Sequence, residues 1–100
     1  MVIIFVRISV RPEKRKELTQ TLHSIVERVG KESGCLQSGF YQNYDDENGF
    51  VVVEEWATEN DSDAHLRSDL FRVLLGAGSL MRQPPEIVIH TVERSTELKV

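Results

Sequence analysis

Two spacings of hydrophobic residues divide the chain into predicted strands and helices. Four stretches rich in branched or aromatic residues predict β-strands, and they cover residues 2–10, 35–44, 50–56 and 86–92. Between the first two strands, apolar residues recur at offsets of three and four, which predicts a helix with one apolar face. These residues are Leu18, Leu22, Ile25, Val26 and Val29. A second helical region, residues 58–75, precedes the fourth strand.

Turn and capping residues mark the boundaries of these elements. Pro12 suits the first turn of the first helix because its missing N–H costs nothing there. Either Gly30 or Gly34 ends this helix. Asn48-Gly49 is typical of a β-hairpin turn between the second and third strands. The predicted N-cap residues of the second helical region are Thr58 and Ser68.

The order of elements is β-α-β-β-α-β. With right-handed crossovers, this order predicts an α+β protein with a ferredoxin-like fold, in which one antiparallel sheet carries its helices on one face. The chain has 100 residues, which is the size of one domain. We assign residues 1–94 to this domain and residues 95–100 to a polar C-terminal tail.

Both faces of the predicted sheet are apolar, although a half-exposed antiparallel sheet normally alternates apolar and polar residues. In the first strand, Ile3 and Phe5 point away from Ile4 and Val6. Two helical regions can cover only one face, so we expect a second copy of the chain to cover the other in a homodimer. The alternative is a monomer with an exposed apolar sheet, which is rare.

Composition narrows the class of protein. The net charge is −4 and 28% of the residues are charged, as expected for a soluble cytoplasmic protein. An acidic balance argues against nucleic-acid binding, which normally requires a basic surface. No apolar stretch reaches the roughly 20 residues of a membrane span, and the N-terminus lacks the features of a signal peptide. Cys35 is the only cysteine, so no intrachain disulfide forms.

Three residues are candidates for chemistry. His65 and Trp56 lie where the third strand leads into the second helical region, and Arg7 lies in the first strand. His65 can act as a general base, or it can be a partly buried histidine bonded to the backbone. Trp56 is a core residue or a pocket wall that stacks on a flat substrate. Arg7 lies among apolar neighbours, so it pairs with an acidic residue or holds an anionic ligand in the pocket. Glu54 and Glu55 point to opposite faces, and each is expected in an ion pair or at a solvated edge.

The remaining polar residues give no sign of a metal or cofactor. His23, His90 and Cys35 are scattered and lack the spacing of metal ligands. No Gly-rich loop joins a strand to a helix, so the signatures of dinucleotide and P-loop binding are missing. We therefore predict no metal and no bound cofactor.

Four segments, taken in order and at their spacings, resemble the antibiotic biosynthesis monooxygenase family. They are Val10-Arg11-Pro12-Glu13, Gly34-Cys35-Leu36, Val53-Glu54-Glu55-Trp56, and Ala64-His65-Leu66-Arg67-Ser68 followed by Phe71. The resemblance extends from Val2 to Val92. It implies a dimeric α+β barrel, which agrees with the surplus apolar surface of the sheet.

In several members of this family, an electron-rich phenol or quinol anion reduces oxygen itself, without flavin, haem or metal. The resemblance implies that His65 is the proton acceptor and that Trp56 and Phe71 are pocket walls. The haem-degrading branch needs an Asn and a haem-ligating His where this chain has Val6 and Leu75, so the resemblance does not extend to haem.

The predicted function is a cofactor-independent monooxygenase that oxidises a small aromatic, quinol or polyketide-like substrate with O2. One alternative is a non-catalytic dimeric barrel that binds a small ligand or serves in a stress response. Another is a small-molecule isomerase in which His65 moves protons. The fold alone does not choose among these functions.

Overall fold

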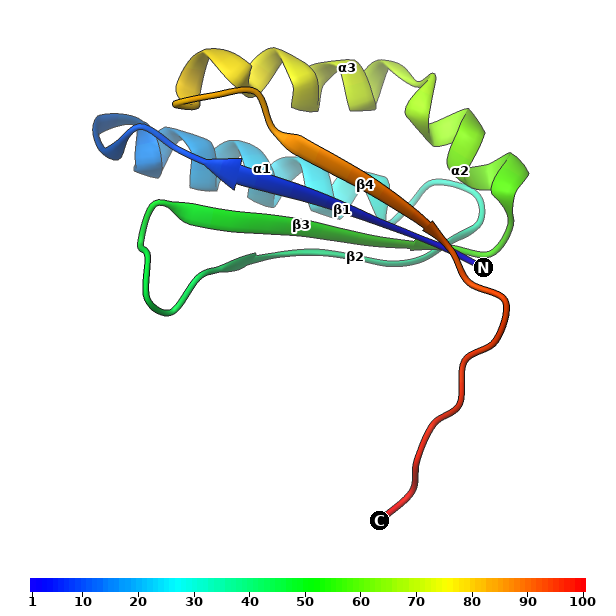
Figure 1. The fold of residues 1–100 in the computed structure, drawn as a ribbon. Helices are drawn as coiled ribbons and strands as arrows, with labels where there is room; N and C mark the ends of the chain where they lie inside the picture. The colour runs from blue at the N-terminus through cyan, green and yellow to red at the C-terminus, as the bar shows by residue number, and fades with distance from the viewer.

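The computed structural model describes the whole chain, residues 1–100. In chain order its elements are β1 (Val2–Ser9), η1 (Pro12–Lys14), α1 (Arg15–Val29), β2 (Cys35–Gln42), β3 (Gly49–Trp56), α2 (Glu59–Leu66), α3 (Asp69–Gly76), η2 (Ala77–Leu80) and β4 (Glu86–Thr91). The strands form one layer and the helices lie on one side of it (Figure 1). None of the helices combines the length and the apolar character needed to cross a lipid bilayer.

The sheet has the order β2-β3-β1-β4, and every neighbouring pair is antiparallel. This is the predicted ferredoxin-like arrangement, so the fold class inferred from the sequence is confirmed. The central strand β1 pairs Val2 with Trp56 of β3 on one side and with Thr91 of β4 on the other. The register of β2 shifts between Cys35 and Gln37 because of an irregularity in that strand.

The core lies between the sheet and the helices. Alternate residues of β1 and β3 point into it, and they are Val2, Ile4, Val6, Ile8, Phe50, Val52, Glu54 and Trp56. The buried face of α1 packs over them with Leu18, Leu22, Ile25 and Val29. Each large aliphatic residue buried here contributes on the order of 1.5–3 kcal/mol to folding.

The structure differs from the sequence-based prediction mainly at the ends of the helices and strands, next to the loops. The second helical region is two short helices, and its predicted caps are confirmed: Thr58 accepts the N–H of Asp61, and Ser68 accepts the N–H of Phe71. Gly30 caps α1, whereas Gly34 lies in the turn before β2 with φ of 82°. The latter conformation favours glycine because L side chains are strained there.

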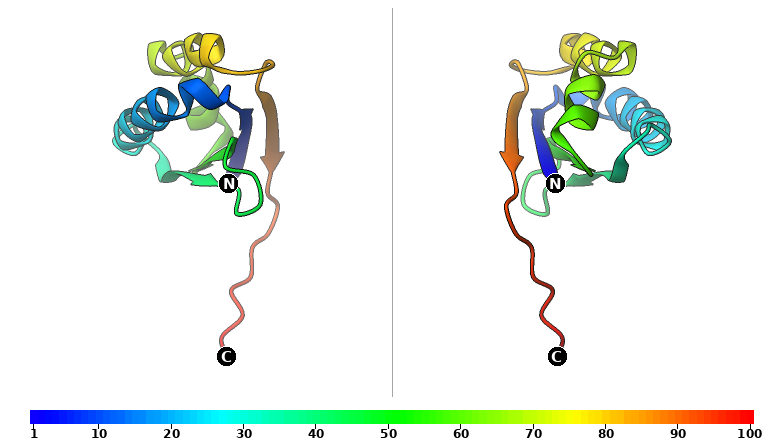
Figure 2. Two further views of the ribbon diagram at one scale, coloured as in Figure 1. Left: turned by 90° about the vertical axis from the view of Figure 1, so that its left-hand side faces the viewer. Right: turned by 90° about the vertical axis from the view of Figure 1, so that its right-hand side faces the viewer.

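No helix covers the other side of the sheet, which is called the open face below (Figure 2). The open face carries half-buried apolar side chains at Ile3, Phe5, Val51, Val53 and Val88. The structure therefore confirms that both faces of the sheet are apolar and that this chain covers only one.

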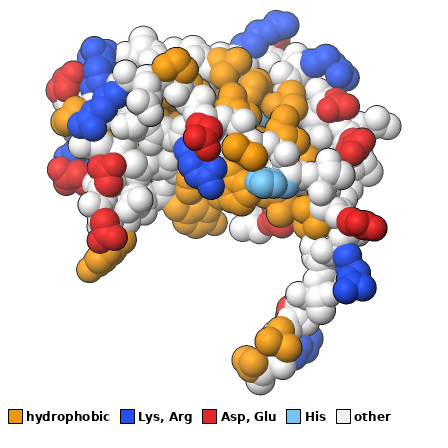
Figure 3. Space-filling model, viewed as in Figure 1, with side chains coloured by type: hydrophobic (Ala, Val, Ile, Leu, Met, Phe, Trp, Pro, Cys, Tyr) orange, Lys and Arg blue, Asp and Glu red, His pale blue; other side chains and the backbone are white.

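The edge strand β4 is poorly covered on its helix-facing side as well. Ile87 and Ile89 point to that side but remain 36% and 50% exposed. Figure 3, in the view of Figure 1, shows hydrophobic side chains gathered in the middle of the molecule next to one histidine. Beyond Thr91 the chain runs away from the body, and Leu98 and Val100 near its end are exposed (Figures 1 and 2).

Candidate functional site

His65 lies in the last turn of α2 and points into the core, where it meets two aromatic residues. Its ring stacks on Trp56 with a centroid distance of 4.6 Å and an interplanar angle of 26°. The ring of Phe71, from the first turn of α3, packs against the imidazole in a T-shaped arrangement with a centroid distance of 5.5 Å. The fold thus brings together three of the four residues proposed from the sequence.

The sequence analysis did not anticipate that both nitrogens of His65 face carboxylates. Nδ1 lies 2.9 Å from Oε2 of Glu32, and Nε2 lies 3.0 Å from Oε1 of Glu54. The first contact is an aligned hydrogen bond, whereas the second is close enough for an ion pair but is not aligned as a hydrogen bond. We call Glu32, His65 and Glu54 the ionic chain.

Glu54 is the most enclosed member of the ionic chain. Its side chain is 0% exposed, and its Oε1 accepts a hydrogen bond of 3.3 Å from the indole N–H of Trp56. Its Oε2 has no protein partner, and neither does the buried hydroxyl of Ser38, the residue paired with Glu54 on β2. Buried polar groups are normally hydrogen-bonded, so these two atoms, which belong to paired residues of β2 and β3, are unusual.

The ionic chain runs from the core to the surface. His65 is 1% exposed, whereas the side chain of Glu32 is 26% exposed and reaches solvent. Burial alone would lower the pKa of His65, but the contacts with Glu54 and Glu32 outweigh it and raise the pKa above the ordinary value of about 6.5. These contacts therefore favour the protonated ring, whose Nδ1–H donates to Glu32 and whose Nε2–H faces the carboxylate of Glu54. The ionic chain thus places two carboxylates around one imidazole.

Local interactions hold the ionic chain in place from three segments. Ser68 donates its hydroxyl hydrogen to the carbonyl oxygen of His65 at 2.6 Å while it caps α3. Glu32 belongs to the turn that contains Gly34, and the carbonyl of Gly34 accepts the N–H of Ala57 just after β3. The turn after α1, the end of β3 and the helix α2 are thereby joined around the imidazole.

Arg7 does not belong to this group, and its expected place in a pocket with His65 is wrong. It lies on the open face because its neighbours Val6 and Ile8 occupy the inward-facing positions of β1. There its guanidinium lies 3.3 Å from Glu86 and 5.5 Å from the ring centre of Phe5. The ion pair expected as one of its roles is present, but it is exposed.

The hollow expected next to His65 is also not found. The surface has three hollows, and none is lined by His65, Trp56 or Phe71. The physical reason is that the indole, the phenyl ring and the Glu54 carboxylate fill the space around the imidazole. Arg7 does line a hollow, but it is the one on the open face.

Other reactive groups are few. No set of three or more His, Cys, Asp or Glu side chains is arranged to hold a metal ion. Burial and the negative charges of Glu54, Glu32 and Glu55 raise the pKa of the Cys35 thiol, which disfavours a reactive thiolate.

Fold and site together define a ferredoxin-like α+β protein with a buried histidine between two carboxylates and beside a tryptophan. The sequence profile of the antibiotic biosynthesis monooxygenase family matches residues 1–75. The chain belongs to this family, and the resemblance stated from the sequence is confirmed.

Similar proteins agree with this assignment. The candidate monooxygenase YcnE of Bacillus subtilis is 29% identical over 91% of this chain and 96% of its own length. A solved structure of a conserved protein from Methanosarcina mazei is 30% identical, covers 89% of both chains and has a TM-score of 0.83. A candidate antibiotic biosynthesis monooxygenase from Deinococcus radiodurans is 20% identical over all of both chains, and its TM-score of 0.91 shows the same fold. Membership of the family and the likeness to YcnE support a monooxygenase-like function.

Proposed function

We propose that the protein is a monooxygenase that oxidises a small aromatic, quinol or polyketide-like substrate with O2 and without a bound cofactor. The observation that carries this proposal is the ionic chain, together with membership of the family. A buried carboxylate and a buried imidazole, with a second carboxylate at the surface end, are costly to place in a small core, and such perturbed groups mark functional sites more often than other positions do.

The proposed chemistry needs a proton acceptor more than it needs an electron carrier. Loss of a proton makes a phenol or quinol electron-rich, and its anion passes electrons to O2. One oxygen atom then enters the substrate, the other leaves as water, and the substrate supplies all four electrons. In this proposal the proton passes to a carboxylate of the ionic chain, and Glu32 returns it to solvent from the exposed end.

Oxygen uptake with a panel of hydroquinones and anthrones tests the proposal. Glu32→Gln removes the exposed carboxylate, so we expect a loss of rate with the fold retained, whereas Glu27→Gln on the exposed side of α1 should keep the rate. His65→Gln should also lose the rate, with circular dichroism and sedimentation as checks on its fold. Uptake that is unchanged in Glu32→Gln and His65→Gln would refute the role of the ionic chain.

A second candidate function is a non-catalytic dimer that binds a small ligand. The filled space around His65 favours it, because a substrate has no hollow from which to touch the imidazole. This candidate predicts no oxygen uptake from any quinol, in the wild type or the variants, together with saturable binding of a small molecule. A wild-type rate that exceeds the uncatalysed rate would exclude it.

We also propose that the protein is a cytoplasmic homodimer whose open faces meet across a two-fold axis. The apolar residues of the open face support this arrangement, since monomers rarely expose large apolar patches. Phe5→Arg should split the dimer in sedimentation at micromolar concentration, because it places a charge in the centre of the face. Val73→Arg, at an exposed position of α3, is the matched control and should leave the mass at twice that of one chain. A folded wild-type monomer would contradict the proposal.

A further inference from the structure

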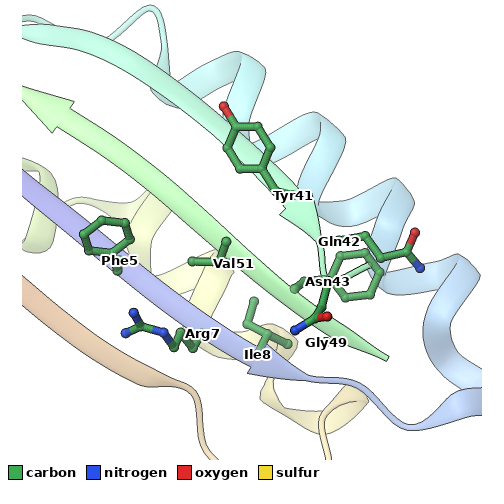
Figure 4. A pocket seen from close by; sticks show the side chains of 9 residues that line it. Phe5, Arg7, Ile8, Tyr41, Gln42, Asn43, Gly49 and Val51 are labelled. Atoms are coloured by element: carbon green, nitrogen blue, oxygen red, sulfur yellow. The ribbon is translucent and has the colours of Figure 1, made fainter. Parts of the chain in front are cut away.

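The open face contains a hollow that is separate from the ionic chain. It lies along one end of strands β1, β2 and β3 and has a volume of about 370 Å3, within the range of small-ligand sites. Figure 4 shows Val51 in the middle, with Phe5 and Arg7 on one side and Tyr41 on the other. The short side chain of Val51 between these longer ones produces a trough that follows the strands.

The lining of this trough combines flat apolar surfaces with a single charge. Phe5, Tyr41 and Val51 offer two aromatic rings and an aliphatic floor. Arg7 is the only charged residue among the lining residues, and Asn43 adds a carboxamide at one end. Because its acidic partner Glu86 does not line the trough, Arg7 makes the lining cationic, which favours an anion with a flat apolar body.

The guanidinium of Arg7 has donors to spare for such a ligand. It has five N–H groups and makes one hydrogen bond, of 3.3 Å, to Glu86. Both side chains of this pair are more than half exposed, at 55% and 68%, so the pair itself adds little stability. A carboxylate can therefore pair with the free edge of the guanidinium while Glu86 stays in place.

We propose that the trough binds a small aromatic carboxylate, with its ring on Val51 between Phe5 and Tyr41 and its carboxylate on Arg7. This site is distinct from the ionic chain, because Arg7 and His65 lie on opposite sides of the sheet. It does not depend on oxygenase activity. Where a second copy covers the open face, the ligand is enclosed between the two sheets, and its negative charge compensates a guanidinium taken out of water.

Titration of the full-length protein with 1-naphthoate tests the proposal, by calorimetry and by NMR of the isotopically labelled protein. We expect saturable binding, with shifts at Phe5, Val51 and Tyr41, and a lower affinity as salt increases. Arg7→Gln should weaken binding at least about tenfold, because this factor corresponds to the lower end of the energy of a hydrogen bond to a charged group. Arg72→Gln changes an exposed arginine paired with Asp69 on α3 and should bind like the wild type.

Neutral 1-naphthalenemethanol provides the second comparison, since it keeps the rings and lacks the charge. We expect it to bind at least about tenfold more weakly than 1-naphthoate. Equal affinity for the two compounds, an unchanged affinity in Arg7→Gln, shifts confined to residues around His65, or no saturable binding would each overturn the proposal. A dimer structure in which partner side chains fill the trough would overturn it as well.

Discussion

The substitution His65→Leu tests whether the contact between His65 and Glu54 contributes to the free energy of unfolding as a buried ion pair does. Leucine fills much of the same space, so the main effect is electrostatic. It leaves Glu54, which is 0% exposed, without a counter-charge. Removing one partner of a buried ion pair costs about 3–5 kcal/mol, which is a large share of the roughly 5–15 kcal/mol that stabilises a domain.

Replacing both partners should have a much smaller effect. In Glu54→Leu/His65→Leu no charge is left unpaired in the core, and such replacements are often neutral or even stabilising by about 1–4 kcal/mol. The indole N–H of Trp56 loses its acceptor, which costs about 1–3 kcal/mol. We therefore expect the double variant to recover most of the stability that the single variant loses.

Urea unfolding at pH 7, followed by circular dichroism at one fixed protein concentration, measures these free energies. The exposed pair Arg72 and Asp69 is the control, and replacing both with Ala should change the free energy of unfolding by less than about 1 kcal/mol. A His65→Leu variant within about 1 kcal/mol of the wild type would refute the reasoning. So would a double variant that loses the sum of both single effects.

Three further predictions concern stability. Because the folded-state pKa of His65 is raised, its contribution is fully present below about pH 6.5 and is lost as pH rises through the folded-state pKa, by up to about 1.4 kcal/mol per pH unit. His65→Gln should lack this slope in urea unfolding between pH 6 and 9, and equal slopes would contradict the prediction. Gly34→Ala should cost at least about 1–2 kcal/mol, because φ is positive and a Cβ would collide with Asp61, whereas Gly76→Ala has open space and should gain about 0.4–1 kcal/mol. Ser68→Ala removes the cap of α3 and should lower the free energy of unfolding by about 1 kcal/mol, while no change would exclude that role.

The fold was predictable because local patterns set both its elements and their order. The offsets of the apolar residues in α1 match its buried face, and Thr58 and Ser68 cap the two later helices. The alternation of side chains along β1 also predicted which residues share a face of the sheet, since Ile4 and Val6 are buried under the helices while Phe5 lies on the open face. Only the ends of elements moved, where loop hydrogen bonds compete with strand pairing.

The candidate site was only partly predictable, for reasons of geometry. Arg7 was grouped with His65, although its alternation with Val6 and Ile8 already indicated the other side of the sheet. For Glu54 a usable signal was present: it shares its alternation with Val52 and Trp56, so an inward direction followed. Glu32 gave no such signal, because it lies in a turn and meets His65 only through the tertiary packing of three segments.

The energetic and functional roles of the ionic chain can be separated by one comparison. If the ionic chain only holds the turn after α1 against β3 and α2, an apolar pair should do the same with a smaller loss of folding free energy, since charges lose hydration on burial. A Glu54→Leu/His65→Leu protein that is as stable as the wild type but takes up no oxygen would then assign the charges to chemistry. If that protein is stable and retains full oxygen uptake, the charges are structural, and the proton acceptor of the proposed reaction must lie elsewhere.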